Sequence, residues 1–253
     1  MAFQTVFNRV EKKYILTEEQ YTALRKMLEG YMTVDQYGET TICNIYYDTP
    51  DHLLVRRSLE KPIYKEKLRV RSYGTPKAGG TVFVEVKKKF KGVVYKRRAS
   101  MGLEQAYEFT KGVPADTKDR QIENELLYFV KFYKGIVPAM YLSYDRIAMF
   151  GNEDHELRLT FDANITFRED DLLLESGSYG RKLLDKGVRI MEIKILNAMP
   201  LWLSHMLDEL KIYPASFSKY GSAYELLTRE KLASEHRSSA ADNKEKEKVN
   251  NCA

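Results

Sequence analysis

The chain has 253 residues, of which 43% are hydrophobic and 30% are charged, and its net charge is +5. This composition is typical of a globular protein with a sizeable core. The 41 Lys and Arg residues face 36 Asp and Glu residues, which excludes a histone-like basic coat, so we expect no nucleic-acid partner. The two cysteines, Cys43 and Cys252, form no CxxC motif, and nothing therefore indicates a zinc site or a disulfide framework.

Neither end of the sequence contains a long run of apolar residues. The residues Met1–Tyr14 lack the apolar segment of a signal peptide. The chain contains no run of about 18 apolar residues, so we expect no membrane span of its own and a cytoplasmic location. The segment Ser234–Ala253 is polar and poor in apolar residues, which predicts a disordered tail after a single domain over residues 1–233.

Segments that alternate charged and apolar residues recur along the chain. Strands are expected over Phe7–Leu16, Thr40–Asp48, Ile63–Tyr73, Thr81–Phe90, Val93–Met101, Ala139–Phe150, Glu156–Asp162 and Arg189–Leu196. Lys91-Gly92 is the expected turn of a hairpin between the fourth and fifth of these strands. Because successive side chains on a strand point to opposite faces, six of the strands have one charged and one apolar face.

Helices are expected between these strands. Thr17-Glu18-Glu19-Gln20 forms a capping box, which predicts a helix to about Tyr31. Amphipathic patterns predict further helices over Leu103–Thr110, Gln121–Tyr133, Ala198–Leu210 and from about Gly221 to Leu232. A short helix or a loop is expected over Asp51–Leu59.

The recurrence of charged strand faces indicates the fold. A single charged face is typical of an open antiparallel sheet with one solvated side. Six such faces with mixed acids and bases favour the lining of a closed barrel, with helices on its apolar outside. We therefore predict an α+β fold built on an eight-stranded antiparallel closed β-barrel with a charged lumen.

The cations on these faces predict a polyanionic ligand. Lys65, Lys67, Arg69 and Arg71 share one face of a single strand, a repulsive arrangement unless an anion such as a polyphosphate fills the space in front of it. The carboxylates of Glu192, Glu11 and Glu85 are candidate ligands of a divalent cation that bridges to phosphates. Asp162 either has a functional role or simply pairs with Arg158.

Several kinds of catalysis are not indicated. The sequence has no Walker A loop, no GxGxxG motif and no histidine in a recognisable triad or metal cluster. Phosphoryl transfer needs only positioning and electrostatic stabilisation, and it is therefore the reaction that the residues favour.

Short motifs follow one another along the chain in a characteristic order. They are Arg9-x-Glu11-x-Lys13-Tyr14, Tyr46-Tyr47-Asp48-Thr49, Lys67-Leu68-Arg69-Val70-Arg71-Ser72-Tyr73, Val84-Glu85-Val86-Lys87, Lys96-Arg97-Arg98, Tyr144-Asp145-Arg146, Arg158-Leu159-Thr160-Phe161-Asp162, Glu192-Ile193-Lys194 and Ser218-Lys219-Tyr220. This order resembles the VTC domain, the polyphosphate polymerase domain of the vacuolar transporter chaperone complex. That domain belongs with the CYTH phosphohydrolases to the triphosphate tunnel metalloenzymes. The resemblance covers roughly Phe7 to Leu232.

The resemblance implies an eight-stranded tunnel, a Mn²⁺ or Mg²⁺ ion, and transfer of the ATP γ-phosphate onto a growing polyphosphate chain. It also implies ATP, pyrophosphate and polyphosphate as ligands, and membrane-protein partners are common in the family. By motif matching, the residues implied to bind phosphates are Lys13, Lys67, Arg69, Arg71, Lys87, Lys96, Arg98, Arg146, Arg158, Lys194 and Lys219. Within this set the catalytic residues would be Lys13, Arg69, Arg71, Lys87, Arg146, Arg158 and Lys219. The metal would be held by Glu192, with Glu11 and Glu85 as second-choice ligands or as partners of lysines.

Two alternative functions stay open at this point. CYTH proteins open with the motif ExExK, whereas Arg9 replaces the first acid in this chain. This departure favours polymerase over hydrolase activity, but a CYTH-like triphosphatase would use the same tunnel. A non-catalytic module that binds polyphosphate is the third possibility.

Overall fold

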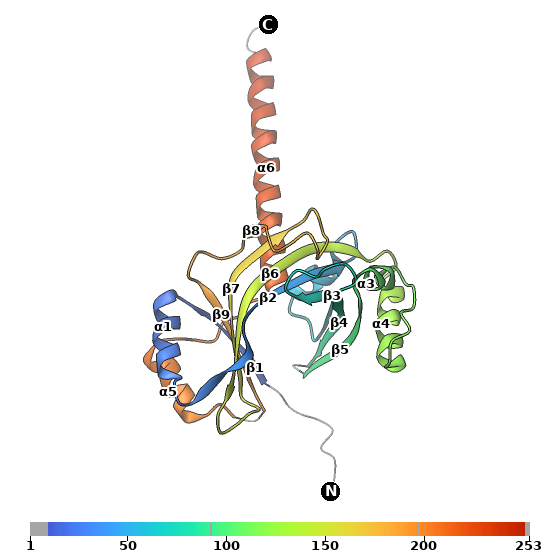
Figure 1. Ribbon diagram of the computed structural model, residues 1–253. Coiled ribbons are helices and arrows are strands. Elements are labelled where there is room, and N and C mark those ends of the chain that lie inside the picture. Colours follow the sequence, from blue (N-terminus) through green and yellow to red (C-terminus); the bar gives the residue numbers. More distant parts are fainter. Residues whose placement is uncertain (1–9, 92, 197, 251–253) are drawn as a thin grey trace.

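The computed structural model describes residues 10–91, 93–196 and 198–250 (Figure 1). The strands are β1 (Val10–Leu16), β2 (Met32–Asp48), β3 (Tyr64–Tyr73), β4 (Thr81–Phe90), β5 (Val93–Gly102), β6 (Val137–Gly151), β7 (Arg158–Arg168), β8 (Arg181–Lys182) and β9 (Arg189–Ile195). The helices are α1 (Glu18–Met27), α2 (Leu53–Leu59), α3 (Leu103–Thr110), α4 (Arg120–Phe132), α5 (Leu201–Glu209) and α6 (Lys219–Asn250). No described helix is both long and apolar enough to cross a membrane.

The strands form one antiparallel sheet with the order β1-β9-β7-β6-β2-β3-β4-β5, and β8 pairs with β7. Each of the eight predicted strands is present, although β2 begins earlier than predicted and the short β8 was not predicted. The hairpin register pairs Glu85 with Arg98 and Lys87 with Lys96. These four side chains therefore share one face, as the alternation predicts.

The predicted closed barrel is wrong in one respect, because the sheet does not close. Among the described residues, no strand pairing joins β1 to β5, which lie at the two ends of the order. The free edge of β1 is instead covered by the segment before α6, since Tyr14 forms a β-bridge with Pro214 and the Ala215 amide donates to the Lys13 carbonyl at 2.7 Å. Covering an edge in this way satisfies backbone groups that closure would otherwise pair.

The apolar side of the sheet packs against helices, as predicted. One buried cluster joins β2, β3, β4 and β5 to α3 and α4, and includes Leu68, Val84 and Phe109. A second joins β1, β6, β7 and β9 to α1 and α5, and includes Leu24 and Ile193. The burial of these side chains provides the main favourable free energy of the fold.

The charged side, called the inner face below, is not polar throughout. Ile42, Tyr46 and Tyr144 lie on this face and are buried against Val55 of α2 and Tyr220 of α6. Two helices therefore cover part of the inner face, whereas the sequence predicts helices on the outside alone. Tyrosine suits this position because its ring packs in the apolar cluster while its hydroxyl reaches the neighbouring charges.

Helix α6 begins at the inner face and projects far from the sheet (Figure 1). In place of the predicted disorder, the structure has helix over residues 234–250. This part of the sequence contains three Glu and three Lys residues, which have high helix propensity even without an apolar stripe. The division of the chain at residue 233 stays a prediction.

Candidate functional site on the inner face

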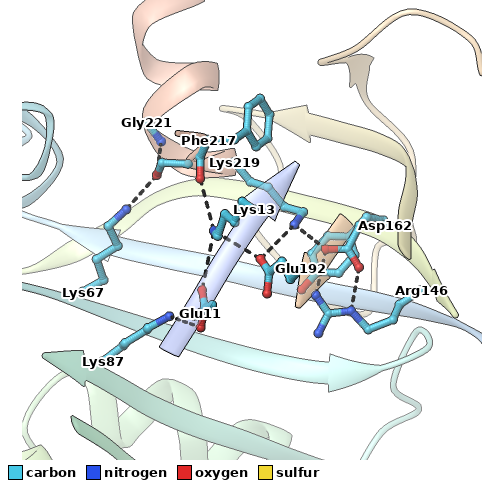
Figure 2. Close-up of polar contacts among 12 residues, drawn as sticks. Glu11, Lys13, Lys67, Lys87, Arg146, Asp162, Glu192, Phe217, Lys219 and Gly221 are labelled. Carbon is cyan, nitrogen blue, oxygen red and sulfur yellow. Dashed lines mark hydrogen bonds and ion pairs between the residues drawn. The ribbon is translucent and has the colours of Figure 1, made fainter. Parts of the chain in front are cut away.

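The charged residues of the inner face form two groups. The first, called the mixed cluster, contains Glu11, Lys13, Arg146, Asp162, Glu192 and Lys219 (Figure 2). The second, called the arginine cluster, contains Arg69, Arg71, Glu85, Lys96 and Arg98. Most of the residues predicted to bind phosphates are therefore brought together on one face, as the strand alternation implies.

In the mixed cluster, lysines alternate with carboxylates. Lys13 Nζ lies 3.1 Å from Glu192 Oε1 and also donates to the Phe217 carbonyl at 3.1 Å. Lys219 contacts Asp162 and lies 4.0 Å from the same Glu192 oxygen. Each carboxylate is thus shared between two cations, which keeps the local charge close to balanced (Figure 2).

Asp162 is fully buried and is paired differently from the prediction. Arg146 Nε and Nη2 donate to its two carboxylate oxygens at 2.6 and 2.7 Å. Arg146 lies directly opposite Asp162 across the β6–β7 pair, whereas Arg158 lies four positions away along Asp162's own strand. The predicted Asp162–Arg158 pair is therefore wrong, because cross-strand neighbours approach more closely than residues two pleats apart.

The start of α6 is built into the site. Lys67 Nζ donates to Ser218 Oγ at 2.8 Å, and Ser218 Oγ in turn accepts from the Gly221 amide at 3.2 Å. The same turn supplies the Phe217 carbonyl to Lys13 and the Lys219 ammonium to Asp162. A segment distant in sequence thus connects β1, β3 and β7 at one end of the inner face.

The arginine cluster surrounds a single carboxylate. Glu85 is 1% exposed, and its oxygens lie 2.5 Å from Arg98 Nε, 2.6 Å from Lys96 Nζ and 2.7 Å from Arg69 Nη2. Arg71 Nε is 3.8 Å away. One negative charge therefore faces four positive charges, and the cluster carries an excess of positive charge that an anion would neutralise.

Neutral side chains hold the two most buried arginines of the arginine cluster, Arg71 and Arg69. Arg71 donates to Asn44 Oδ1 at 2.9 Å and to the Tyr144 hydroxyl at 3.1 Å, and Arg69 donates to the Tyr46 hydroxyl at 3.3 Å. Both tyrosines belong to the ordered motifs of the sequence, whereas Asn44 belongs to none of them. The signal that could have found Asn44 is its place on the same strand face as Tyr46.

Burial and neighbouring charges shift the pKa values of the site in consistent directions. Burial alone would raise the pKa of Glu85, but Arg69, Arg71 and Lys96 together hold it below its usual value. The pKa of Glu192 is lowered in the same way by Lys13 and Lys219 against the effect of burial. Conversely, burial lowers the pKa of Lys67 to about 8 and that of Lys96 to about 8. The carboxylates are thus ionised at neutral pH, whereas these lysines lose their protons just above it.

The two clusters meet where the sheet is open. Glu11 of β1 accepts from Lys87 of β4 at 3.4 Å and lies 3.9 Å from Lys13. We call this opening the seam, and the ion pair connects its two sides. Glu11 therefore interacts with lysines, one of the two roles that were expected for it.

The remaining predicted residues lie at the periphery. Lys194 is the register partner of both Glu11 and Arg158, so these three side chains form a row on the inner face. Arg158 is exposed, and neither it nor Lys194 forms an ion pair in the part of the chain that the structure describes. Arg9 lies outside the described residues.

Two carboxylates of the inner face are placed to share a divalent metal ion with a ligand. Among the described residues, no three His, Cys, Asp or Glu side chains are close enough together to hold an ion by themselves. Glu11 and Glu192 nevertheless lie on the same face of paired strands and share Lys13 as a neighbour. Mg²⁺ and Mn²⁺ commonly take one or two carboxylates and complete their shells with water and substrate phosphates. The donor set fits an ion that arrives with a phosphate ligand.

Thr160 adds a further oxygen that sequence reasoning missed. Its hydroxyl is buried and has no hydrogen-bond partner among the described residues, and Thr160 lies opposite Glu192 in the β7–β9 register. A buried hydroxyl without a partner is uncommon, and this one lies between Arg158 and Asp162 on the charged face of β7. Glu85, in contrast, is enclosed by cations, which suits its expected alternative role as their partner.

Two solved structures have a fold similar to that of this chain. A protein from Bacillus halodurans, provisionally assigned as an adenylate cyclase, is 13% identical with a TM-score of 0.53, and the alignment covers 83% of this chain and 93% of that one. A protein from Hippeastrum, also provisionally assigned as an adenylyl cyclase and described as having a dominant triphosphatase activity, is 16% identical with a TM-score of 0.53 and coverages of 84% and 93%. At these identities the similarity concerns the fold alone.

Comparison with curated proteins finds no match. The model of one protein family, the VTC domain, matches residues 8–228, which is nearly the whole region over which the ordered motifs occur. The match confirms the resemblance found in the sequence, and the chain belongs to the VTC domain family.

Proposed function

We propose that the protein is a metal-dependent polyphosphate polymerase, which transfers the γ-phosphate of ATP onto an inorganic polyphosphate chain at the inner face of the sheet. The observation that carries this proposal is the arginine cluster, in which four cations surround one buried carboxylate. Membership of the VTC domain family supports it. The cytoplasmic location and a membrane-protein partner stay predictions.

In the proposed reaction, an oxygen of the terminal phosphate of the acceptor chain attacks the γ-phosphorus of ATP. The bond from that phosphorus to the β–γ bridging oxygen breaks, ADP leaves, and the chain is one phosphate longer. The acceptor oxygen is already ionised, so no general base is required. Arg69, Arg71 and Arg98 bind phosphate oxygens by charge-assisted hydrogen bonds, and Lys13 and Lys219 stabilise the charge that spreads over the transferred group.

Glu11 and Glu192 would hold the divalent ion, with the Thr160 hydroxyl beside them. When bound, the ion would neutralise phosphate charge and orient the phosphate oxygens for transfer. Lys13 Nζ lies 3.9 Å from the Glu11 carboxylate and 3.1 Å from that of Glu192. When both carboxylates bind the ion, Lys13 would lose these two partners and would be free to contact phosphates.

A triphosphatase is the second candidate, and a specific observation supports it. The similar structure from Hippeastrum is described as having a dominant triphosphatase activity. The same inner face could direct water onto the terminal phosphate, and Arg9, which stands where CYTH proteins have an acid, is the sequence feature against this reading. A non-catalytic polyphosphate-binding module is the third candidate.

One experiment separates the three. The protein is incubated with ATP and either Mn²⁺ or Mg²⁺, with and without a pyrophosphate primer, and the products are resolved on a gel stained for polyphosphate while ADP and free phosphate are assayed. A ladder of long chains with matching ADP supports the polymerase. Free phosphate without chains would identify a triphosphatase, and binding without either product would identify the binding module.

A further inference from the structure

Two aromatic residues stand at the edge of the arginine cluster. Tyr73 ends β3, and Phe83 lies near the start of β4, so both lie at the same end of the inner face. Tyr73 follows Arg69 and Arg71 on alternate positions of β3, and Phe83 precedes Glu85 in the same way on β4. Their rings meet edge to face with centroids 5.7 Å apart, and Tyr73 is 52% exposed.

Arg98 connects this aromatic pair directly to the charged cluster. Its Nη2 donates to the Tyr73 hydroxyl at 2.9 Å, and its guanidinium carbon lies 4.0 Å from the centroid of the Phe83 ring. Its Nε meanwhile binds Glu85. An anion bound by Arg98 would therefore lie next to the half-exposed ring of Tyr73.

We propose that Tyr73 and Phe83 form a nucleobase subsite, which places the purine ring of ATP beside Tyr73 while the triphosphate extends along Arg98 and Arg69. The inference rests on the proposed function, because it takes ATP as the ligand of the arginine cluster. Inorganic phosphates have no π-face, so stacking on an exposed aromatic ring beside a phosphate-binding row would strengthen the binding of a nucleotide and not that of an inorganic phosphate. Stacking on such a ring tolerates any base, because every base presents a π-face.

A purely structural role makes a different prediction for the same residues. If the aromatic pair serves only to orient Arg98, its loss weakens every phosphate ligand equally. If Tyr73 stacks on the base, its loss weakens ATP and spares inorganic triphosphate. The ratio of the two affinities therefore separates the explanations.

The test measures binding of ATP and of inorganic triphosphate by calorimetry, without divalent metal so that no turnover occurs. The variants are Tyr73→Ala, which removes the ring, and Tyr73→Phe, which removes only the hydroxyl that accepts from Arg98. Tyr128→Ala is the matched control, because Tyr128 is 65% exposed and lines a cavity of about 630 Å³ beside α4, with Lys88 on the outer side of the sheet.

For Tyr73→Ala, ATP affinity is expected to fall on the order of tenfold, with triphosphate affinity within about twofold of wild type. Tyr73→Phe should keep the wild-type ratio of the two affinities, and Tyr128→Ala should change neither. Equal losses for both ligands in Tyr73→Ala would overturn the subsite. The polymerase proposal is judged separately by the polyphosphate ladder, so either proposal can fail while the other stands.

Discussion

Replacing Glu85 by glutamine tests the account of the arginine cluster most directly. The substitution keeps the size of the side chain and removes its charge. Three cationic side chains with nitrogens within 2.8 Å of the carboxylate would then lose their common counter-ion. We expect a less stable protein in the absence of ligand.

The size of the effect follows from burial. Breaking a buried ion pair by removing one partner typically costs about 3–5 kcal/mol. The Lys96 and Arg98 side chains are 41% and 31% exposed, so solvent screens part of the repulsion. We therefore expect the free energy of unfolding to fall by about 2–3 kcal/mol, which lowers Tm by about 4–12 °C for a domain of this size.

Thermal unfolding followed by circular dichroism, with and without inorganic triphosphate, measures this loss. Triphosphate should raise the Tm of Glu85→Gln by more than that of wild type, because the anion replaces the missing negative charge. Glu125→Gln is the matched control, because the Glu125 carboxylate lies 2.7 Å from Arg97 but both side chains are more than a third exposed. The loss of unfolding free energy in this variant should therefore stay below about 1 kcal/mol. A ligand-free Glu85→Gln protein as stable as wild type would refute the reasoning.

The remaining predictions concern the mixed cluster and the two lysines with lowered pKa values. Glu192→Gln should reduce turnover by about 10²-fold or more while metal-free triphosphate binding is kept or strengthened; unchanged turnover would show that Glu192 is not a metal ligand. Lys219→Met should lower the free energy of unfolding by about 3 kcal/mol, because Asp162 is fully buried, and an unchanged urea midpoint would contradict this. Because the pKa values of Lys67 and Lys96 are about 8, both are charged below pH 7 and lose their protons as the pH rises through 8. Triphosphate should therefore bind more weakly at pH 9 than at pH 7 and with proton uptake at pH 8.5, which calorimetry in buffers of different ionisation enthalpy would detect; binding without uptake would argue against these pKa values.

Much of the fold could be predicted from local patterns. The alternation of charged and apolar residues placed Glu85 and Arg98 on one face, and the register confirms this. The capping box at Thr17 and Gln20 is present, with both of its hydrogen bonds formed. These features depend on neighbours in sequence or on one hairpin, where the period of side-chain direction is enough.

Other features depend on contacts that alternation does not encode. Whether β1 pairs with β5 is decided by the curvature of the whole sheet and by the segment around Pro214 that covers the edge of β1. The partner of Asp162 is decided by cross-strand register, which selects Arg146. The role proposed for Thr160 is equally hidden, since threonine on a strand is unremarkable until its buried hydroxyl is seen to have no partner in the described part of the chain.

The opening of the sheet has a topological consequence for a polymeric ligand. A ring of hydrogen-bonded strands admits a long chain only when one end threads through it. Here the links described across the seam are made by side chains, namely the Lys87–Glu11 pair at 3.4 Å and the Lys67–Ser218 hydrogen bond at 2.8 Å. Separating a partly exposed pair of this kind costs about 0–1 kcal/mol, and one hydrogen bond adds about 1 kcal/mol. Under the proposed function, an internal stretch of a polyphosphate chain would therefore enter sideways, and the ends of the polymer would not need to be free for it to bind.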